Sequence, residues 1–282
     1  MKFEQFIRKV TDKNPFKKGS ASVIAPRLID AFRFPYGPFK FRTHLAKGID
    51  YTIFASADYQ NWKLIANGTC AGDSIDYIDS EAFQHNHRFY RLFAEETPSM
   101  NVIGYVSMTL PPGFTMLANP LDAPSNTVPE LFKEWPDGTT LSKFDTRFFR
   151  LDENSVKHGK WANSSEKMMP GEGAIFFNPT NDYKTLSFVG ELMQGNLSIP
   201  IPSGFSIRSS PMPKAGHLQD DLGFPIADGD VIHLFDRDRQ KYVLHPYENG
   251  KWPAGPPILG VGEAFWVAKT TPGNWTRSVF VG

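Results

Sequence analysis

The sequence predicts an all-β protein whose C-terminal part is a tandem duplication. Residues 110–121 read LPPGFTMLANPL and come back as residues 201–212, which read IPSGFSIRSSPM, at a shift of 91 residues. Short runs of alternating apolar and polar residues fill most of the chain, and Gly, Asn and Pro turns separate them. No amphipathic pattern extends beyond two helical turns. We therefore expect a small antiparallel sandwich and two tandem pseudo-repeated β-domains, with an extended arm before them.

Residues 1–38 are predicted to form a basic extended arm that starts with a short amphipathic helix. Ten Lys and Arg residues between positions 1 and 42 face only three acidic ones. Such a segment either grips an acidic neighbour, nucleic acid or an anionic surface, or it is a solvated tail. The helix is too short to be stable alone in water, so we expect it to dock on its own body or on a neighbouring subunit. Its apolar side has four residues at helical spacing: Phe3, Phe6, Ile7 and Val10.

Residues 39–97 are predicted to form the sandwich. Alternating runs occur at 39–42, 51–55, 62–65, 75–78 and 88–93, with turn residues between them. The segments ASAD at 55–58, NW at 61–62, Asp79 and RFYR at 88–91 resemble immunoglobulin- or fibronectin-type-III-like modules from large surface and secreted proteins of planctomycete and verrucomicrobial bacteria. This resemblance implies that Trp62, Phe89 and Tyr90 are core residues and that the Asp turns are structural. Such relatives usually follow a secretion signal, which this sequence does not show.

Residues 101–190 and 192–282 are the two predicted β-domain repeats. A period of 91 residues is too long for a solenoid, so each copy is either a domain or half of one pseudo-symmetric domain. Each copy has a run of strands and turns, and segments 127–134 and 218–223 are expected to make one or two helical turns. The region resembles duplicated domains of uncharacterised proteins from the same bacterial groups, which implies a fold and no activity. At the same shift the matches continue through Leu131 and Leu222, Asp137-Gly138 and Asp228-Gly229, Phe144-Asp145 and Phe235-Asp236, Gly159-Lys160-Trp161 and Gly250-Lys251-Trp252, and Gly171-Glu172 and Gly262-Glu263.

Composition excludes several classes of protein. Cys70 is the only cysteine, so the chain has no internal disulfide and no cysteine metal cluster, and we interpret Cys70 as a small buried residue. No run reaches the roughly 18 apolar residues of a membrane span. Residues 1–20 carry a charge every few positions, whereas a classical signal peptide needs an apolar core. We expect the protein either to stay inside the cell or to leave by a route that reads no cleaved signal.

Candidate chemistry is sparse, and each candidate has a structural alternative. Glu172 and Glu263 are repeated carboxylates that could face each other as general acid and base, or could each accept backbone N–H groups after a Gly turn. Solvated loop histidines explain His85 and His87 better than a metal pair does, because no third ligand has recognisable spacing. The acidic stretches 219–221 and 236–239 do not follow the spacing of a calcium loop.

The two repeated tryptophans are the best candidates for a ligand site. Trp161 and Trp252, each in a Gly-Lys-Trp segment, are either stacking platforms for sugar rings or plugs of two small cores. Repetition favours the core role.

We expect a non-enzymatic structural or interaction subunit of a larger assembly, such as a filament, sheath, shell or phage-like particle, with the arm docking on a neighbour. This prediction includes no catalytic residue, metal or cofactor. The expected partners are other copies or other protein subunits, with no specific nucleic acid and no membrane span. A carbohydrate-binding surface protein that uses Trp161 and Trp252 is the first alternative, and a glycoside-type hydrolase is the second.

Overall fold

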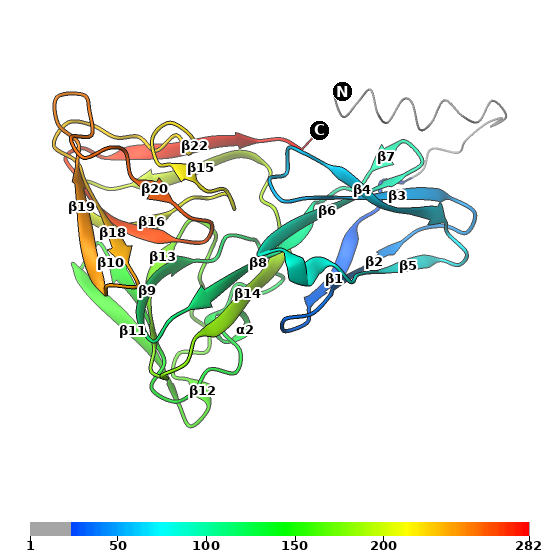
Figure 1. Ribbon diagram of the computed structural model, residues 1–282, viewed down its shortest axis with the longest axis horizontal. Coiled ribbons are helices and arrows are strands. Elements are labelled where there is room, and N and C mark those ends of the chain that lie inside the picture. Colours follow the sequence, from blue (N-terminus) through cyan, green and yellow to red (C-terminus); the bar gives the residue numbers. More distant parts are fainter. Residues whose placement is uncertain (1–23, 282) are drawn as a thin grey trace. The chain divides into compact units, whose positions relative to one another are not determined.

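The computed structural model describes residues 24–281 and confirms the all-β prediction (Figure 1). The described chain divides into two compact units. The first runs to Tyr105 and includes Val189–Leu192, and the second holds Val106–Phe188 and Met193–Phe280. Within the described residues, no helix is both long and apolar enough to cross a membrane.

The first unit is an immunoglobulin- or fibronectin-like sandwich of antiparallel strands. One sheet has the order β1-β2-β5 and the other the order β14-β8-β6-β3-β4, with β7 paired to β6. A single 3-10 turn, η1 (Ala82–Gln84), separates β5 from β6. The strands are β1 (Leu28–Arg33), β2 (Phe39–His44), β3 (Asp50–Ser56), β4 (Lys63–Thr69), β5 (Ser74–Asp79), β6 (His87–Ala94) and β7 (Thr97–Pro98). Two further strands belong to the first unit only in part: β8 (Ile103–Leu110) up to Tyr105, and β14 (Lys184–Glu191) from Val189.

Aromatic residues fill the core of this sandwich. Phe39 stacks on Tyr90 with ring centroids 4.7 Å apart, and the Tyr90 hydroxyl donates to Asp79 Oδ2 at 2.6 Å. Phe89 and Tyr90 are fully buried, as the sequence resemblance implies, whereas Trp62 is half-buried. The Asp58 carboxylate closes a turn: burial alone would raise its pKa, but hydrogen bonds from the residues around it lower the pKa to about 2. The Asp turns therefore have the structural role that was expected.

The first strand begins inside the segment that we assigned to the arm. Leu28–Arg33 forms β1, antiparallel to β2, although turn residues dominate the sequence on both sides of it. Leu28 is buried, its N–H donates to Asn101 Oδ1 at 2.8 Å, and Asn101 Nδ2 donates to the Leu28 carbonyl at 2.9 Å. These two long-range hydrogen bonds hold the strand in place, and the residues next to Leu28 in the sequence do not predict them. The four predicted docking residues of the arm, from Phe3 to Val10, lie outside the described residues.

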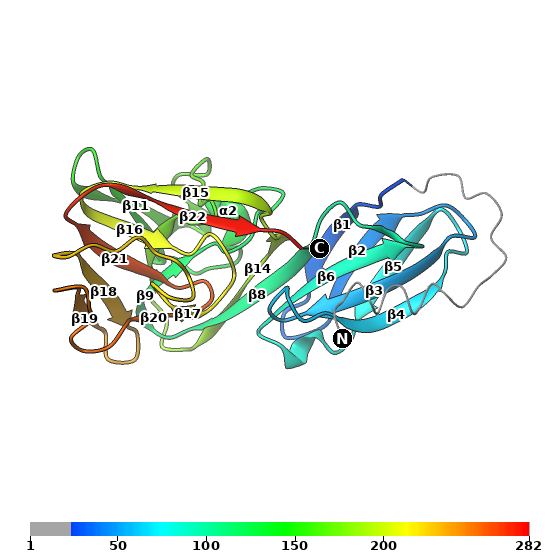
Figure 2. The same ribbon diagram turned by 90° about the horizontal axis from the view of Figure 1, so that it is seen from above.

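The second unit contains both repeats. Repeat 1 has a sheet of order β12-β11-β10-β13-β9, and repeat 2 has one of order β16-β21-β18-β19. Two-stranded pairs β15-β22 and β17-β20 complete repeat 2 (Figure 2). The elements are β9 (Gly113–Ala118), α2 (Val128–Leu131), β10 (Thr140–Asp145), β11 (Arg150–Lys157), β12 (Lys160–Trp161), β13 (Gly173–Asn178), β15 (Gly195–Ile201), β16 (Gly204–Ser209), β17 (Gly216–His217), β18 (Val231–Asp236), β19 (Lys241–Pro246), β20 (Ile258–Leu259), β21 (Ala264–Lys269) and β22 (Gly273–Val279).

Strand bounds and pairing registers are consistent with the duplication. A shift of 91 places β9 on β16, β10 on β18 and β13 on β21, with identical bounds. The same shift carries the pair Gly113↔Asn178 onto Gly204↔Lys269. The expected helical turn at 127–134 contains α2, and segment 218–223 forms hydrogen-bonded turns rather than a helix.

The repeats meet through reciprocal contacts. The Ala118 N–H donates to the Gly262 carbonyl at 2.8 Å, and the Ser209 N–H donates to the Gly171 carbonyl at 3.2 Å. The shift of 91 exchanges these two bonds, because it carries 118 onto 209 and 171 onto 262. Such a swap of donor and acceptor is the signature of a two-fold relation. Both repeats fall in one compact unit, and these contacts are consistent with two halves related by a pseudo-two-fold axis.

Candidate functional site

An aromatic face spans both repeats of the second unit. One of its members, Trp266, lies in β21 between Phe265 and Val267, which are both fully buried. Because successive side chains of a strand point to opposite sides, Trp266 points away from the repeat 2 core that Phe265 and Val267 fill. We define the aromatic face as Phe144, Phe149, Phe205, His233, Tyr242 and Trp266.

Edge-to-face ring contacts join these side chains across the repeat boundary. Phe144 of repeat 1 packs on Trp266 of repeat 2 with ring centroids 4.8 Å apart and planes at 70°. Phe149 lies 5.3 Å from Phe144 and 6.2 Å from Phe205. The Trp266 indole N–H donates to the Tyr242 hydroxyl at 3.2 Å. The face is thus a connected set of rings, held in place by both repeats.

Much of this apolar surface is open to solvent. Phe149 is 67% exposed, Phe205 41% and Tyr242 39%. Around them the hairpin tip and the outer strands add further exposed apolar residues: Phe148, Leu151 and Leu244. These residues give the second unit an exposed surface that is rich in apolar side chains.

A local turn presents the phenylalanine pair at the tip of the β10–β11 hairpin. Asp145 Oδ1 accepts the N–H groups of Arg147 at 2.8 Å and Phe148 at 3.3 Å. Hydrogen bonds from the Arg147 side chain and from these backbone groups lower the pKa of Asp145 to about 2. Phe149 has a φ of 52°, which turns its side chain out of the strand direction. The geometry of this turn therefore leaves the rings of Phe148 and Phe149 exposed to solvent.

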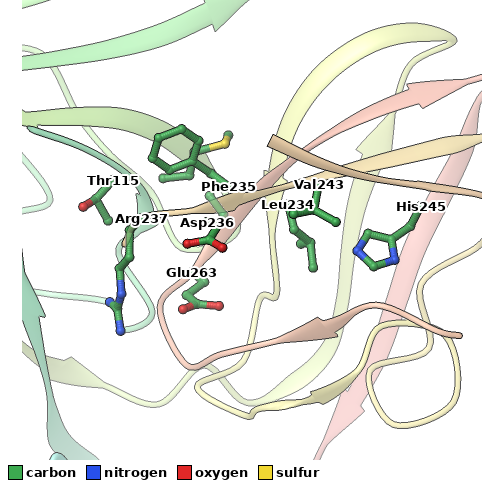
Figure 3. A pocket seen from close by; sticks show the side chains of 10 residues that line it. Thr115, Leu234, Phe235, Asp236, Arg237, Val243, His245 and Glu263 are labelled. Atoms are coloured by element: carbon green, nitrogen blue, oxygen red, sulfur yellow. The ribbon is translucent and has the colours of Figure 1, made fainter. Parts of the chain in front are cut away.

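A pocket of ≈ 250 Å³ lies between the repeats (Figure 3). Glu263 Oε2 accepts the Gly260 N–H at 2.8 Å, and burial lowers the pKa of His245. Repeat 1 contributes Thr115 and Met116 to the wall. Repeat 2 contributes the remaining lining residues: Leu234, Phe235, Asp236, Arg237, Val243, His245, Glu263 and Ala264.

The repeated tryptophans lie away from both features. Trp161 is only 9% exposed, and its indole N–H donates to the Phe132 carbonyl at 3.0 Å. It lines the edge of a cavity of ≈ 590 Å³ together with Phe132 and Trp135, which are also buried. Trp252 is half-buried, and its indole N–H donates to Gln219 Oε1 at 2.9 Å. This burial favours the core role for both residues.

Each repeated glutamate accepts a backbone N–H within its own turn. Glu172 Oε2 accepts the Met169 N–H at 2.9 Å, and Glu263 Oε2 accepts the Gly260 N–H in the equivalent way. Both glycines that precede them have positive φ, 89° at Gly171 and 75° at Gly262. This arrangement favours the structural alternative, in which the carboxylate closes a Gly turn.

The other polar candidates also have local structural roles. Asp221 Oδ2 accepts the His217 N–H at 2.8 Å, and Asp236 Oδ1 accepts the Arg239 N–H at 2.9 Å. Cys70 is buried, with its thiol donating to the Leu45 carbonyl. Burial lowers the pKa of both His85 and His87. Across residues 24–281, His, Cys, Asp and Glu do not gather in groups of three that could hold a metal ion.

Comparisons with known proteins place the chain in no family. No family model matches it, and no match was found among curated proteins. Among solved structures it is similar to a crystal structure of chicken CNTN1 FN1–FN3 domains, at 12% sequence identity and a TM-score of 0.22. That similarity covers 90% of this chain and 91% of the other. The resemblance to planctomycete and verrucomicrobial proteins stays a prediction.

Sequence reasoning missed the aromatic face. Two signals pointed toward it: adjacent phenylalanines, Phe148 and Phe149, follow an Asp turn, and the matching turn of repeat 2 is charged. The two turns thus keep the Asp and differ in the residues that follow it.

Proposed function

We propose that this protein is a non-enzymatic interaction subunit that joins other protein subunits through the aromatic face. The observation that carries the proposal is the exposure of connected rings from both repeats on one surface. Protein interfaces are enriched in Tyr, Trp and Phe at their centres, and these residues supply most of the binding energy. A filament, sheath, shell or phage-like particle would use such a contact repeatedly.

The composition of the face favours a protein partner over a sugar. Sugar sites combine an aromatic platform with polar groups placed to bind hydroxyls. Here the Trp266 N–H is already used by Tyr242, and the exposed residues around the face include Phe148, Leu151 and Leu244. The guanidinium groups of Arg147 and Arg150 lie over the Phe148 ring at 5.5 and 5.4 Å, a pairing that is common at protein interfaces.

The native mass of the full chain tests this proposal. We expect light scattering after size exclusion to show larger species as concentration rises, with regular particles in negative stain. The double variant Phe148→Ser/Phe149→Gln should raise the concentration needed for association at least about tenfold, because central aromatic residues commonly contribute 2 kcal/mol or more. Gln is chosen for position 149 because the equivalent residue of repeat 2 is Gln240.

Two controls make the result specific. Phe83→Ser removes a phenylalanine of similar exposure from η1 in the other unit and should leave association unchanged. Deletion of residues 1–23 tests the arm separately and leaves β1 intact. A monomer at every concentration would contradict self-assembly, and binding of polysaccharide that is lost in the double variant would favour the carbohydrate alternative instead.

A further inference from the structure

The pocket of Figure 3 has a counterpart in repeat 1 that a lysine side chain already occupies. Lys143 Nζ donates to Glu172 Oε2 at 2.8 Å and to the Lys167 carbonyl at 2.9 Å. The Glu172 carboxylate also accepts the Met169 N–H, which closes the turn around it. The ammonium therefore lies among a carboxylate, a carbonyl and the neighbouring strands. Repeat 1 shows how this fold binds a primary ammonium group.

In repeat 2 the position equivalent to Lys143 has no positively charged side chain. The shift of 91 replaces Lys143 by Leu234, while Glu172 becomes Glu263 and keeps its turn. Arg208, which pairs with Glu172 in an isolated β-bridge and interacts with it electrostatically, has Leu117 as its counterpart. Both cationic positions around the carboxylate have thus become leucine.

Other substitutions change the wall of this space. Asp152 of repeat 1 is Val243 in repeat 2, and Asn154 is His245. In repeat 1 the Asn154 side-chain amide donates to the Asn163 carbonyl at 2.9 Å. The result is the ≈ 250 Å³ pocket, with Glu263 at its wall.

We propose that this pocket binds the side-chain ammonium of a lysine presented by a protein partner. Leu234, Val243 and Met116 match the methylene chain of a lysine, and the Glu263 carboxylate matches its charged end. Among the described residues Glu263 forms no ion pair with a Lys or Arg, and its Oε2 accepts the Gly260 N–H. A lysine from outside would restore the pairing that repeat 1 makes internally.

The other charged residues that line the pocket affect its affinity for a lysine. Asp236 is engaged by Arg239, whose Nη1 lies 3.2 Å from Asp236 Oδ2. Arg237 also lines the pocket, and its guanidinium donates to the Thr109 carbonyl at 3.4 Å. Because a like charge near the ligand opposes binding, replacement of Arg237 by Gln should tighten the complex.

Binding of a lysine probe to the full chain tests the inference. The probe is Nα-acetyl-lysine N-methylamide, measured by saturation-transfer NMR, and the uncharged control is the same compound acetylated at Nε. We expect the charged probe to bind and the acetylated probe to bind at least about tenfold more weakly, because acetylation removes the positive charge that would pair with the Glu263 carboxylate.

Variants identify the site. Leu234→Lys should fill the pocket as Lys143 does in repeat 1 and abolish binding, and Glu263→Gln should weaken it at least about tenfold. Glu153→Gln removes the same charge from an exposed position of β11 and should change nothing. If Glu263→Gln does not fold, Leu234→Lys still tests the site, since repeat 1 has a lysine, Lys143, at the equivalent position. No binding of the charged probe, or equal binding to wild type and Leu234→Lys, would overturn the inference.

The inference rests on the proposed function only in assigning the lysine to a protein partner. Probe binding is measured on the isolated chain, whereas assembly is measured by native mass, so either result can fail without the other.

Discussion

Repeat 1 and repeat 2 fill two equivalent buried positions with different side chains. At equivalent buried positions repeat 1 has Thr139 and Asn178, whereas repeat 2 has Asp230 and Lys269. Lys269 Nζ donates to Asp230 Oδ2 and to the Pro225 carbonyl, and both charged side chains are almost completely buried. Since β10 and β18, and likewise β13 and β21, have equivalent bounds and pairing, the fold accepts either two neutral side chains or an ion pair there. The lesson is that a buried ion pair can be an alternative to neutral packing and is not a requirement of the architecture.

The largest expected effect comes from breaking that ion pair on one side. Lys269→Met leaves Asp230 buried without its counter-ion, and we expect a loss of about 3–5 kcal/mol in the free energy of unfolding, measured with urea. The Asp230 carboxylate still accepts the Ala227 and Thr270 N–H groups, so the variant should fold. The double variant Asp230→Thr/Lys269→Asn copies repeat 1 and should recover most of the loss. An equal loss in both variants would show that the two repeats are not interchangeable at this position.

A smaller effect is expected where the repeats touch at equivalent residues. Gly173 of repeat 1 and Ala264 of repeat 2 are related by the shift of 91, and a Cβ at Gly173 would lie 2.7 Å from Ala264 Cβ and 2.5 Å from Ile207 Cγ2. Only one of the two positions has room for a methyl group. Gly173→Ala should therefore cost about 1–3 kcal/mol in the free energy of unfolding, because overpacking forces the backbone apart.

The exchanged double variant sharpens this test of the pseudo-two-fold relation. Gly173→Ala/Ala264→Gly moves the methyl group to the other repeat, and it should be more stable than Gly173→Ala alone in the same urea measurement. A double variant that is less stable than the single one would place the strain on Ile207 rather than on the paired position.

The smallest effect concerns the Asp turns at the hairpin tips. Asp145 has a pKa lowered to about 2, first by the Arg147 side chain, and the pKa of Asp236 is also lowered, first by the Arg239 N–H. A folded-state pKa below the unfolded value gives stability that is complete above the unfolded pKa of about 4 and is lost as pH falls toward 2. Asp145→Asn should remove part of this acid sensitivity, seen as a smaller drop in thermal midpoint between about pH 5 and pH 2.5 than in wild type. An identical drop would mean that other carboxylates dominate.

Much of the architecture could be predicted because its signals are local. Alternation indicated the strands, and repeated Asp-Gly and Gly-Glu pairs marked turns whose glycines have positive φ in both copies, including Gly138 and Gly229. Edge strand β1 escaped prediction because it depends on Asn101, which lies 73 residues away. Trp161 and Trp252 became candidates for a ligand site because both repeats contain them. A residue that occurs in both repeats is one that the fold itself requires, so repetition indicates a structural role.

By itself the sequence determined the all-β class, the duplication and its register, because strand periodicity, turn residues and a constant shift are properties of neighbouring residues. Only the tertiary structure decided which strand faces meet, and therefore that Phe144 and Trp266 share one surface and that the change from Lys143 to Leu234 opens a pocket. Those outcomes depend on contacts between residues about 120 to 150 positions apart. Both proposed sites lie where the two repeats differ, and those differences become visible only when equivalent positions of the repeats are compared in the folded unit.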